Sequence, residues 1–367
     1  MAEEGALKMA FDRLIGQEQW SELLLRAWKN DRLAHALLIS GAPGSGKETL
    51  ALEMAKILNC TEEEYGSCGN CSACKRIERL EHPNLQFIFP LPGGTRDIDD
   101  PLAGLNKDTL EFIQSEIARK AANPYYRIEI PGANVVRIDS IRSIRKNAYL
   151  KSAEPGKKVV IVSRAEKMNN EAANSFLKLL EEPPPDTYLF LTTSKPDSLV
   201  STIRSRCQEI KLNRLERSKV IESILSAGAT AKRAEELAEL VDGDIGRALK
   251  LMEKGEYDER VEIAEEIIGV ISNGAAKEIS SLNRKISILS KEGKEKLTDI
   301  LNIALHKLID DGVPGIMRSK VAMPFDKAID LIGRNIYIPM IFTTLVYETR
   351  YLLKSKSKNR SETAKIG

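Results

Sequence analysis

The chain has 367 residues, enough for two or three domains with a substantial core. Its 55 Lys and Arg against 53 Asp and Glu give a formal charge of +2, so no overall charge excess points to nucleic acid. We expect a cytoplasmic protein without a membrane segment, because no run of eighteen apolar residues occurs and the acidic start lacks the apolar part of a signal peptide.

Short apolar runs alternate with helical patterns over the first two hundred residues. The run AHALLISG at 34–41 predicts a buried parallel strand, and the next residues, 47–59, have apolar side chains at helical spacing. The pattern at 169–182 also predicts a helix, which the prolines at 183–185 end. Further strands are predicted at 84–90, 157–163, 187–194 and 207–212. The alternation predicts an α/β fold with a parallel sheet and flanking helices.

The pattern divides the chain into an α/β domain at 1–212 and helical parts after it. Within the first domain, residues 91–133 combine clustered Pro and Gly with one amphipathic stretch, which indicates an insertion. The helical parts are a small domain at 213–254, an all-α domain at 255–354 and a polar tail at 355–367, which we expect to be disordered.

The segment GAPGSGKET at 41–49 has the pattern of a phosphate-binding loop between a strand and a helix. Its glycines allow backbone N–H groups to face a phosphate, and the following helix presents its positive end. The candidate nucleotide-binding residues in this loop are Gly41, Gly44, Gly46, Lys47 and Thr49. The alternative is a relic loop that only turns the chain.

Two substitutions argue against nucleotide hydrolysis. Complete loops of this type place Ser or Thr after the lysine to bind Mg²⁺, and here the residue is Glu48. Hydrolysis also needs acids at the tip of a nearby strand, yet the strand at 157–163 leads into Ser163 and Arg164. Glu166 is interpreted as a misplaced, solvated acid at a helix start. We therefore expect no intrinsic ATPase activity, and weak or no binding of ATP or ADP.

Four of the five cysteines lie within residues 60–74 and predict a metal site. Thiolates at this density favour a structural zinc ion with tetrahedral geometry over disulfides in a reducing compartment. The fifth, Cys207, lies far away in a predicted strand and is interpreted as a core residue. The predicted ligands are Cys60, Cys68, Cys71 and Cys74.

With the loop, the cysteine module, LLEEPP at 179–184 and TIRSRC at 202–207, the chain resembles bacterial clamp-loader subunits. These are AAA+ proteins of the DNA polymerase III holoenzyme, and the resemblance covers residues 11–212. Loss of the hydrolytic residues is similar to the delta-prime group, whereas the motor subunits, gamma and tau, are complete ATPases. The resemblance implies a helical lid at 213–254 and a helical collar at 255–354 for oligomerisation. The insertion at 91–133 does not match the family pattern.

The resemblance also implies roles for single residues. Arg206 in the SRC motif matches an arginine finger, which acts in trans on ATP held by a neighbouring motor subunit. Thr193 and Arg247 match two sensor positions for nucleotide, at the end of a strand and in the lid. Arg204 is the local competitor of Arg206, and a surface arginine paired with an acid is the plainer interpretation of both.

The implied partners are the motor and delta subunits in a hetero-oligomer, with the sliding clamp as an indirect partner and primed DNA in the assembled complex. As a part of the holoenzyme the chain would be classed with DNA-directed DNA polymerase, a nucleotidyltransferase. One alternative is an active ATPase of the gamma/tau type that uses Glu166 and Thr49 in shifted roles. A second is a zinc-dependent nucleic-acid binder that uses the basic segment 142–158.

Overall fold

The structure, a computed structural model, describes residues 11–63, 66–93, 100–152, 154–291, 293–310, 313, 315–334 and 336–363, with backbone only at 254, 316 and 355–363. Residues 1–10 of the first predicted domain, 94–99 of the insertion and 364–367 of the predicted tail therefore lie outside the described residues. The chain divides into two compact units, Met1–Lys250 and Leu251–Gly367. The helices predicted at 213–254 belong to the first unit through Lys250.

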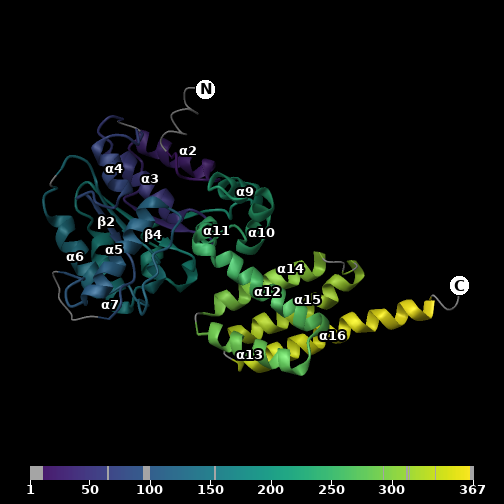
Figure 1. The fold of residues 1–367 in the computed structure, drawn as a ribbon. Helices are drawn as coiled ribbons and strands as arrows, with labels where there is room; N and C mark the ends of the chain where they lie inside the picture. The colour runs from purple at the N-terminus through teal and green to yellow at the C-terminus, as the bar shows by residue number, and fades with distance from the viewer. Residues whose placement is uncertain are drawn as a thin grey trace. The chain divides into compact units, whose positions relative to one another are not determined.

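A five-stranded parallel sheet lies at the centre of the first unit (Figure 1). Its strands are β1 (Ala36–Ser40), β2 (Leu85–Ile88), β3 (Lys158–Val162), β4 (Thr187–Thr193) and β5 (Gln208–Lys211). All five predicted strands are confirmed, in the spatial order β2-β3-β4-β1-β5. The loop after β1 therefore opens at the carboxyl edge of the sheet between β4 and β5, where open α/β sheets bind ligands.

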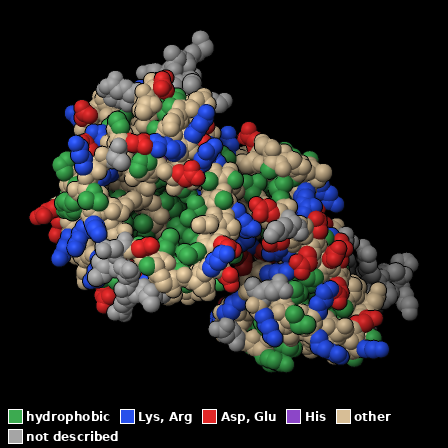
Figure 2. All heavy atoms as spheres, turned by 60° about the vertical axis from the view of Figure 1, so that its left-hand side comes forward, with side chains coloured by type: hydrophobic (Ala, Val, Ile, Leu, Met, Phe, Trp, Pro, Cys, Tyr) green, Lys and Arg blue, Asp and Glu red, His purple; other side chains and the backbone are tan. Residues whose placement is uncertain are grey.

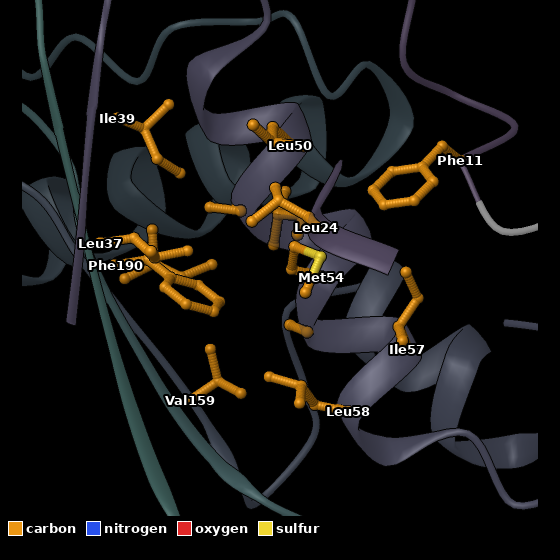
Figure 3. Close-up of a cluster of buried hydrophobic side chains, with 14 of the residues drawn as sticks. Phe11, Leu24, Leu37, Ile39, Leu50, Met54, Ile57, Leu58, Val159 and Phe190 are labelled. Atoms are coloured by element: carbon orange, nitrogen blue, oxygen red, sulfur yellow. The ribbon is translucent and has the colours of Figure 1, made fainter. Parts of the chain in front are cut away.

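Helices cover both faces of this sheet because its strands are apolar on both faces. Leu37 and Ile39 of β1 point to one side and pack with Met54, whereas Leu38 points to the other side and packs with Phe176. Figure 3 shows the first of these two cores, in which the helix after the loop covers β1, β3 and β4. The first core involves α2 (Glu18–Lys29), α3 (Lys47–Asn59) and α4 (Ser72–Glu78), and the second α6 (Ile138–Tyr149), α7 (Asn170–Glu181) and α8 (Ser201–Arg204).

The insertion contains one long helix, α5 (Lys107–Ala122), which confirms the predicted amphipathic stretch. Its Ile113 packs with Phe89, Ile128 and Ile130 in a small core of its own. The chain then returns from α5 through residues 123–130 toward the loop after β1. Short 3-10 helices follow β3 and β4, namely η1 (Ala165–Lys167) and η2 (Pro196–Ser198). The first unit ends in the small helical domain, α9 (Arg217–Ser226), α10 (Ala231–Val241) and α11 (Ile245–Met252).

The second unit is helical throughout its described residues, as predicted. It contains η3 (Glu253–Gly255), α12 (Glu256–Asn273), α13 (Ala276–Leu289), α14 (Lys294–Asp310), α15 (Gly315–Gly333) and α16 (Ile338–Thr363). Arg350 of α16 stabilises the end of α12 by donating to the carbonyl oxygens of Ile271 at 3.0 Å and Gly274 at 2.8 Å. Among the residues of the chain that the structure describes, no helix is long and apolar enough to cross a membrane.

The tail differs from the prediction of disorder, because α16 continues through Thr363. The polar composition of this segment led to the prediction, but residues 355–363 contain no proline or glycine that would end the preceding helix.

Candidate functional site

The loop between β1 and α3 has the backbone of a phosphate cradle. Gly44 and Gly46 have φ angles of +72° and +89°, a region that residues with a Cβ atom rarely adopt. Gln17 holds the loop in place by donating from its side-chain amide to the carbonyl oxygen of Ser45 at 3.1 Å and of Asn213 at 2.8 Å. The sequence predicted the loop, and the structure places it at the amino end of α3.

Lys47 lies over this loop and is partly buried. Its ammonium group donates to the carbonyl oxygens of Gly41 at 2.9 Å and Ala42 at 2.6 Å. Burial lowers the pKa of Lys47 to about 8, against the opposing effect of Glu48 and the more distant Glu166. Desolvation of a lysine at this position makes a bound anion favourable, because an anion would offset the cost of burying the charge.

Thr193 ends β4 next to the loop and is paired with an acid. Its hydroxyl donates to Glu166 Oε2 at 2.7 Å, and its carbonyl oxygen accepts from the Gly41 N–H at 3.3 Å. The interpretation of Glu166 as a solvated acid is therefore wrong, whereas its place at a helix start is confirmed. The side chain is half-buried and fixed by Thr193, because the 3-10 helix η1 turns it back toward the carboxyl edge of the sheet.

Glu48 and Ser163, the two residues that depart from an ATPase pattern, contact each other. The Ser163 hydroxyl donates to Glu48 Oε1, and the Lys120 ammonium donates to Glu48 Oε2. Lys120 comes from α5 of the insertion, and its side chain is only 1% exposed. Its other donors reach the carbonyl oxygens of Pro124 at 2.7 Å and Tyr126 at 2.8 Å, so all three ammonium hydrogens have acceptors.

The insertion also covers the first turn of α3. Thr49 donates its hydroxyl to the carbonyl oxygen of Pro124 at 3.1 Å. The Tyr125 hydroxyl oxygen accepts the backbone N–H of Ile15 at 2.8 Å. A methyl group added at Gly46 would lie 3.3 Å from the Tyr125 hydroxyl oxygen, so the ring passes directly over the loop. Thr49 therefore contacts the insertion, which the sequence did not predict.

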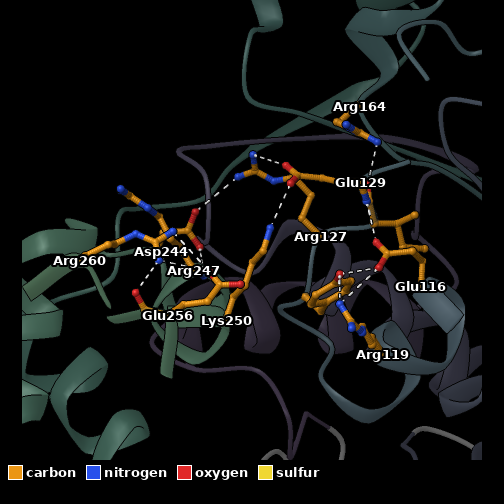
Figure 4. A network of polar contacts seen from close by, with 12 residues as sticks. Glu116, Arg119, Arg127, Glu129, Arg164, Asp244, Arg247, Lys250, Glu256 and Arg260 are labelled. Carbon is orange, nitrogen blue, oxygen red and sulfur yellow. Dashed lines mark hydrogen bonds and ion pairs between the residues drawn. The ribbon is translucent and has the colours of Figure 1, made fainter. Parts of the chain in front are cut away.

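The small helical domain contacts the loop through the start of α11. Asp244 packs so closely on Gly44 that an added methyl group would overlap the Asp244 backbone. Arg127 of the insertion reaches Asp244 at 3.4 Å and Glu129 at 3.6 Å, and Figure 4 shows these side chains converging. The N–H of Arg247 donates to Asp244 Oδ1 at 3.1 Å. Arg247, the predicted lid residue, is thus one helical turn from Asp244, the acid that covers the loop.

The four clustered cysteines have the geometry of a metal site. Their Sγ atoms all lie within 4.8 Å of one another, and those of Cys60 and Cys71 are 4.0 Å apart. Tetrahedral zinc with four sulfur ligands at ~2.3 Å requires sulfur atoms about 3.8 Å apart, which these positions fit. Backbone N–H groups point at the sulfurs of Cys60, Cys68 and Cys71 at 3.2–3.4 Å and would stabilise thiolates there.

Arg206 lies at the opposite edge of the sheet from the loop. It precedes β5, so it sits at the amino ends of parallel strands, whereas the loop follows the carboxyl end of β1. Its guanidinium contacts Glu181 at 2.7 Å and the Thr202 carbonyl oxygen at 3.1 Å, with 38% of the side chain exposed. Arg204 pairs with Asp197 at 2.9 Å and Glu209 at 3.5 Å. The neighbouring Cys207 packs against the core, and burial raises its pKa to about 12.

The structure thus brings the loop residues, Thr193 and the start of α11 together, and places Arg206 apart from them. The roles of Arg206, Thr193 and Arg247 toward nucleotide stay predictions. Lys120, Tyr125 and Asp244 could not be found by sequence reasoning, because the first two belong to an insertion that does not match the family pattern and the third to a helix start. Gln17 could have been noticed in the segment LIGQE at 14–18, since a buried amide needs backbone partners.

Comparisons with known proteins identify the family of the chain. A sequence model of the family described as "DNA polymerase III, delta subunit" matches residues 16–216, more than half of the 367 residues. The delta' subunit of DNA polymerase III from Bacillus subtilis (strain 168) is 30% identical over 66% of this chain and 61% of that protein. The delta' subunit from Escherichia coli (strain K12) is 28% identical over 51% and 45%.

A relative named as a gamma subunit also matches. The gamma subunit of DNA polymerase III from Buchnera aphidicola subsp. Schizaphis graminum is 28% identical over 66% of this chain and 58% of that protein. The matches span between 45% and 61% of the length of these three relatives. The family match covers the whole sheet, the loop and the cysteine cluster, and both delta' and gamma proteins are similar to this chain. The chain therefore belongs to the DNA polymerase III delta-subunit family.

Proposed function

We propose that the chain is a clamp-loader subunit of the delta-prime kind, which binds in the loader without hydrolysing ATP itself. The observation that carries this proposal is the contact of Glu48 with Lys120 and Ser163. A Mg²⁺ ion in a phosphate loop needs a hydroxyl after the lysine and an acid at the tip of a nearby strand. Here Glu48 is paired with Lys120 and accepts a hydrogen bond from Ser163, so neither Glu48 nor Ser163 is available to a metal ion.

The position of Arg206 supports a role in trans. A residue at the amino ends of the strands cannot reach a phosphate held at the carboxyl ends of the same sheet, but it can reach a neighbouring subunit. Its contact with Glu181 is at the surface, where such pairs contribute only ~0–1 kcal/mol, so exchange of partners costs little. We propose that Arg206 stabilises the developing charge on ATP bound by a motor subunit.

The last helix supports assembly through the second unit. Met340, Tyr347 and Tyr351 are spaced by seven and four residues, so they share one face of α16, and each is more than half exposed. Exposed aromatic side chains in a row are typical of protein interfaces. We propose that this face contacts other loader subunits in a ring that acts on the sliding clamp and primed DNA.

Reconstitution tests the proposed function. Mixed with the motor and delta subunits of its own organism, the chain is expected to enter a stable complex with DNA-stimulated ATPase and clamp-loading activity. The chain alone should release no phosphate from ATP with Mg²⁺. Failure to assemble would contradict the loader assignment, whereas hydrolysis by the chain alone would contradict only its non-hydrolysing character.

A second candidate function is an ATPase of the gamma/tau type. One observation favours it, the pairing of Glu166 with Thr193 close to Lys47. The shifted role of Thr49 has less support, because its hydroxyl is buried against Pro124. In the hydrolysis assay above, activity of the chain alone that Lys47→Ala abolishes would favour this candidate.

A nucleic-acid-binding protein has less support. Lys and Arg side chains are interspersed with Asp and Glu over the face shown in Figure 2, without a continuous basic area. The basic segment 142–158 forms the end of α6 and a loop, and Lys158 donates to the carbonyl oxygens of Asn147 and Ala148. Direct contact with DNA is therefore proposed only within the assembled loader.

We propose that the four clustered cysteines hold one structural zinc ion. Purified chain is expected to contain about one zinc per molecule by elemental analysis, and Cys71→Ser should lose it together with much of the stability of α4, because metal binding is coupled to folding. Cys207→Ser is the matched control and should keep the zinc, since Cys207 lies outside the cluster. Equal zinc content in both variants would contradict the assignment.

A further inference from the structure

The insertion places the Lys120 ammonium and the Tyr125 ring beside the loop. A nucleotide bound at this loop would need a metal ion for its phosphates and an apolar slot for its base. We propose that Lys120 and Tyr125 occupy the nucleotide site of this chain as an internal substitute for bound nucleotide. The site is then held together by the chain itself. This inference rests on the phosphate-loop part of the proposed function and is independent of the clamp-loader assignment.

The cation part follows from the partners of Lys120. Its ammonium binds Glu48, which follows the loop lysine, and Glu48 also accepts from Ser163 at the tip of β3. These are the two positions from which a phosphate loop and the tip of a nearby strand would bind a divalent ion. A charged group that is 1% exposed and has acceptors for all its hydrogens is a built part of the site and is unlike a surface lysine.

The aromatic part follows from the surroundings of Tyr125. A base bound beside the loop needs an apolar slot and a backbone group for hydrogen bonding. Tyr125 lies against Gly46, where Leu14 also approaches, and its hydroxyl oxygen takes the N–H of Ile15. On the other side, a methyl group added at Gly246 would overlap the Tyr125 carbonyl oxygen. The ring and its backbone are thus enclosed between α3 and α11.

The acid at the loop points the same way. Asp244 packs on Gly44, at the position where backbone N–H groups would face a phosphate. A carboxylate there repels an anion, and Arg127, which neutralises Asp244, also comes from the insertion. Residues from the insertion and from the start of α11 therefore cover the same phosphate loop. An insertion that lay only on the surface would not contribute to this cover.

Binding of a fluorescent ATP analogue to the isolated full chain tests the proposal. We expect Tyr125→Ala to bind the analogue about tenfold more tightly or better than the unaltered chain, because the slot is opened. Tyr126→Phe is the matched control. The Tyr126 hydroxyl donates to Glu116 at 2.7 Å within the insertion, so loss of this hydroxyl should leave nucleotide binding unchanged. Equal binding by the unaltered chain and Tyr125→Ala would overturn the role of the ring.

The cation part is tested in the Tyr125→Ala background. Adding Glu48→Thr and Lys120→Met supplies the missing hydroxyl and removes the ammonium, so nucleotide binding should become several-fold tighter with Mg²⁺ than without it. Binding that ignores Mg²⁺ in this triple variant would overturn the role of Lys120.

Hydrogen exchange on the unaltered chain keeps the proposal testable if the variants do not fold. A large excess of ATP should leave the exchange of residues 41–49 and 123–127 unchanged. New protection of the loop by ATP would contradict an internally occupied site.

Discussion

Lys120→Met is expected to lower the free energy of unfolding of the first unit by about 3–5 kcal/mol, toward the lower end because 16% of the Glu48 side chain remains exposed. The substitution preserves most of the side-chain volume but leaves Glu48 beside Ser163 without its cation. Both tryptophans of the chain, Trp20 and Trp28, lie in α2 of this unit, so their fluorescence during urea unfolding reports the change.

The pH dependence of this difference identifies its cause. Burial alone would raise the pKa of Glu48, but the charge and hydrogen bond of Lys120, together with Ser163, outweigh burial and hold this pKa below its usual value. A lowered carboxyl pKa contributes stability above the unfolded-state pKa of about 4.3, and that stability is lost as the pH falls through the folded-state pKa. The difference in stability between the unaltered chain and Lys120→Met should therefore shrink as the pH falls from the pKa of Glu48 in the variant, which burial raises, to its lowered pKa in the unaltered chain.

The pKa shifts of Glu48 and Lys120 indicate opposite contributions of the pair to stability, and a double variant distinguishes between them. Burial lowers the pKa of Lys120 despite Glu48, so the ammonium itself costs stability in this site. Glu48→Gln combined with Lys120→Met removes both charges and should be far less destabilising than the sum of the single variants, with a coupling of about 0.5–3 kcal/mol. Strictly additive effects would contradict a direct pair.

Lys107→Met is the matched control on the same helix. The Lys107 side chain is 87% exposed and pairs with Glu111 in the next turn at 3.6 Å, so its loss should change stability by about 0.5 kcal/mol or less. A comparable loss in this variant would show that α5 responds to any lysine substitution.

The sheet could be predicted from sequence because its signals are local. Strands β1, β3 and β4 are short, mostly apolar runs, and the run in β1 is followed at once by a glycine-rich loop and a helix. The signal is weaker in the edge strand β5, where only Ile210 is buried. Parallel strands that are buried on both faces need such continuous apolar runs. The cysteines were predictable for the same reason, because their spacing within fifteen residues already brings the sulfur atoms together.

The internal ion pair could not be predicted, because its partners are 72 residues apart and one belongs to an insertion. A lysine on an amphipathic helix ordinarily faces solvent, and only the fold brings Lys120 to Glu48. Glu166 was misjudged for a related reason. Its position depends on how η1 turns after β3, where Arg164 adopts a left-handed conformation at φ +52°, which its sequence does not signal.

The contact of Lys120 with Glu48 changes how the two departures from the ATPase pattern, Glu48 and Ser163, are interpreted. From the sequence, Glu48 and Ser163 are independent losses of catalytic groups. In the structure they form one contact with Lys120. Glu48→Thr alone would leave the buried Lys120 without its partner, and Ser163→Asp alone would place a second carboxylate beside Glu48. A single substitution in the chain is therefore not expected to recover metal binding, and this explains why the triple variant is the informative one.

Arg206→Ala is expected to reduce hydrolysis at one motor site of a reconstituted loader by about 10³-fold or more, the range found for arginine fingers in phosphoryl transfer. Stability should change by about 0.5 kcal/mol or less, because the side chain is 38% exposed and its pair with Glu181 lies at the surface. Single-turnover ATP hydrolysis measures the effect, since motor sites supplied with other arginines would continue to turn over.

Two neighbouring variants separate a finger from a structural arginine. Arg204→Ala removes a cation that is bound by Asp197 and Glu209 within the chain, so it should leave hydrolysis unchanged. Glu181→Gln frees Arg206 from its internal partner and should preserve or increase stimulation. If Glu181→Gln reduced hydrolysis as much as Arg206→Ala does, the pair itself would be the functional element and direct contact of Arg206 with ATP would be contradicted.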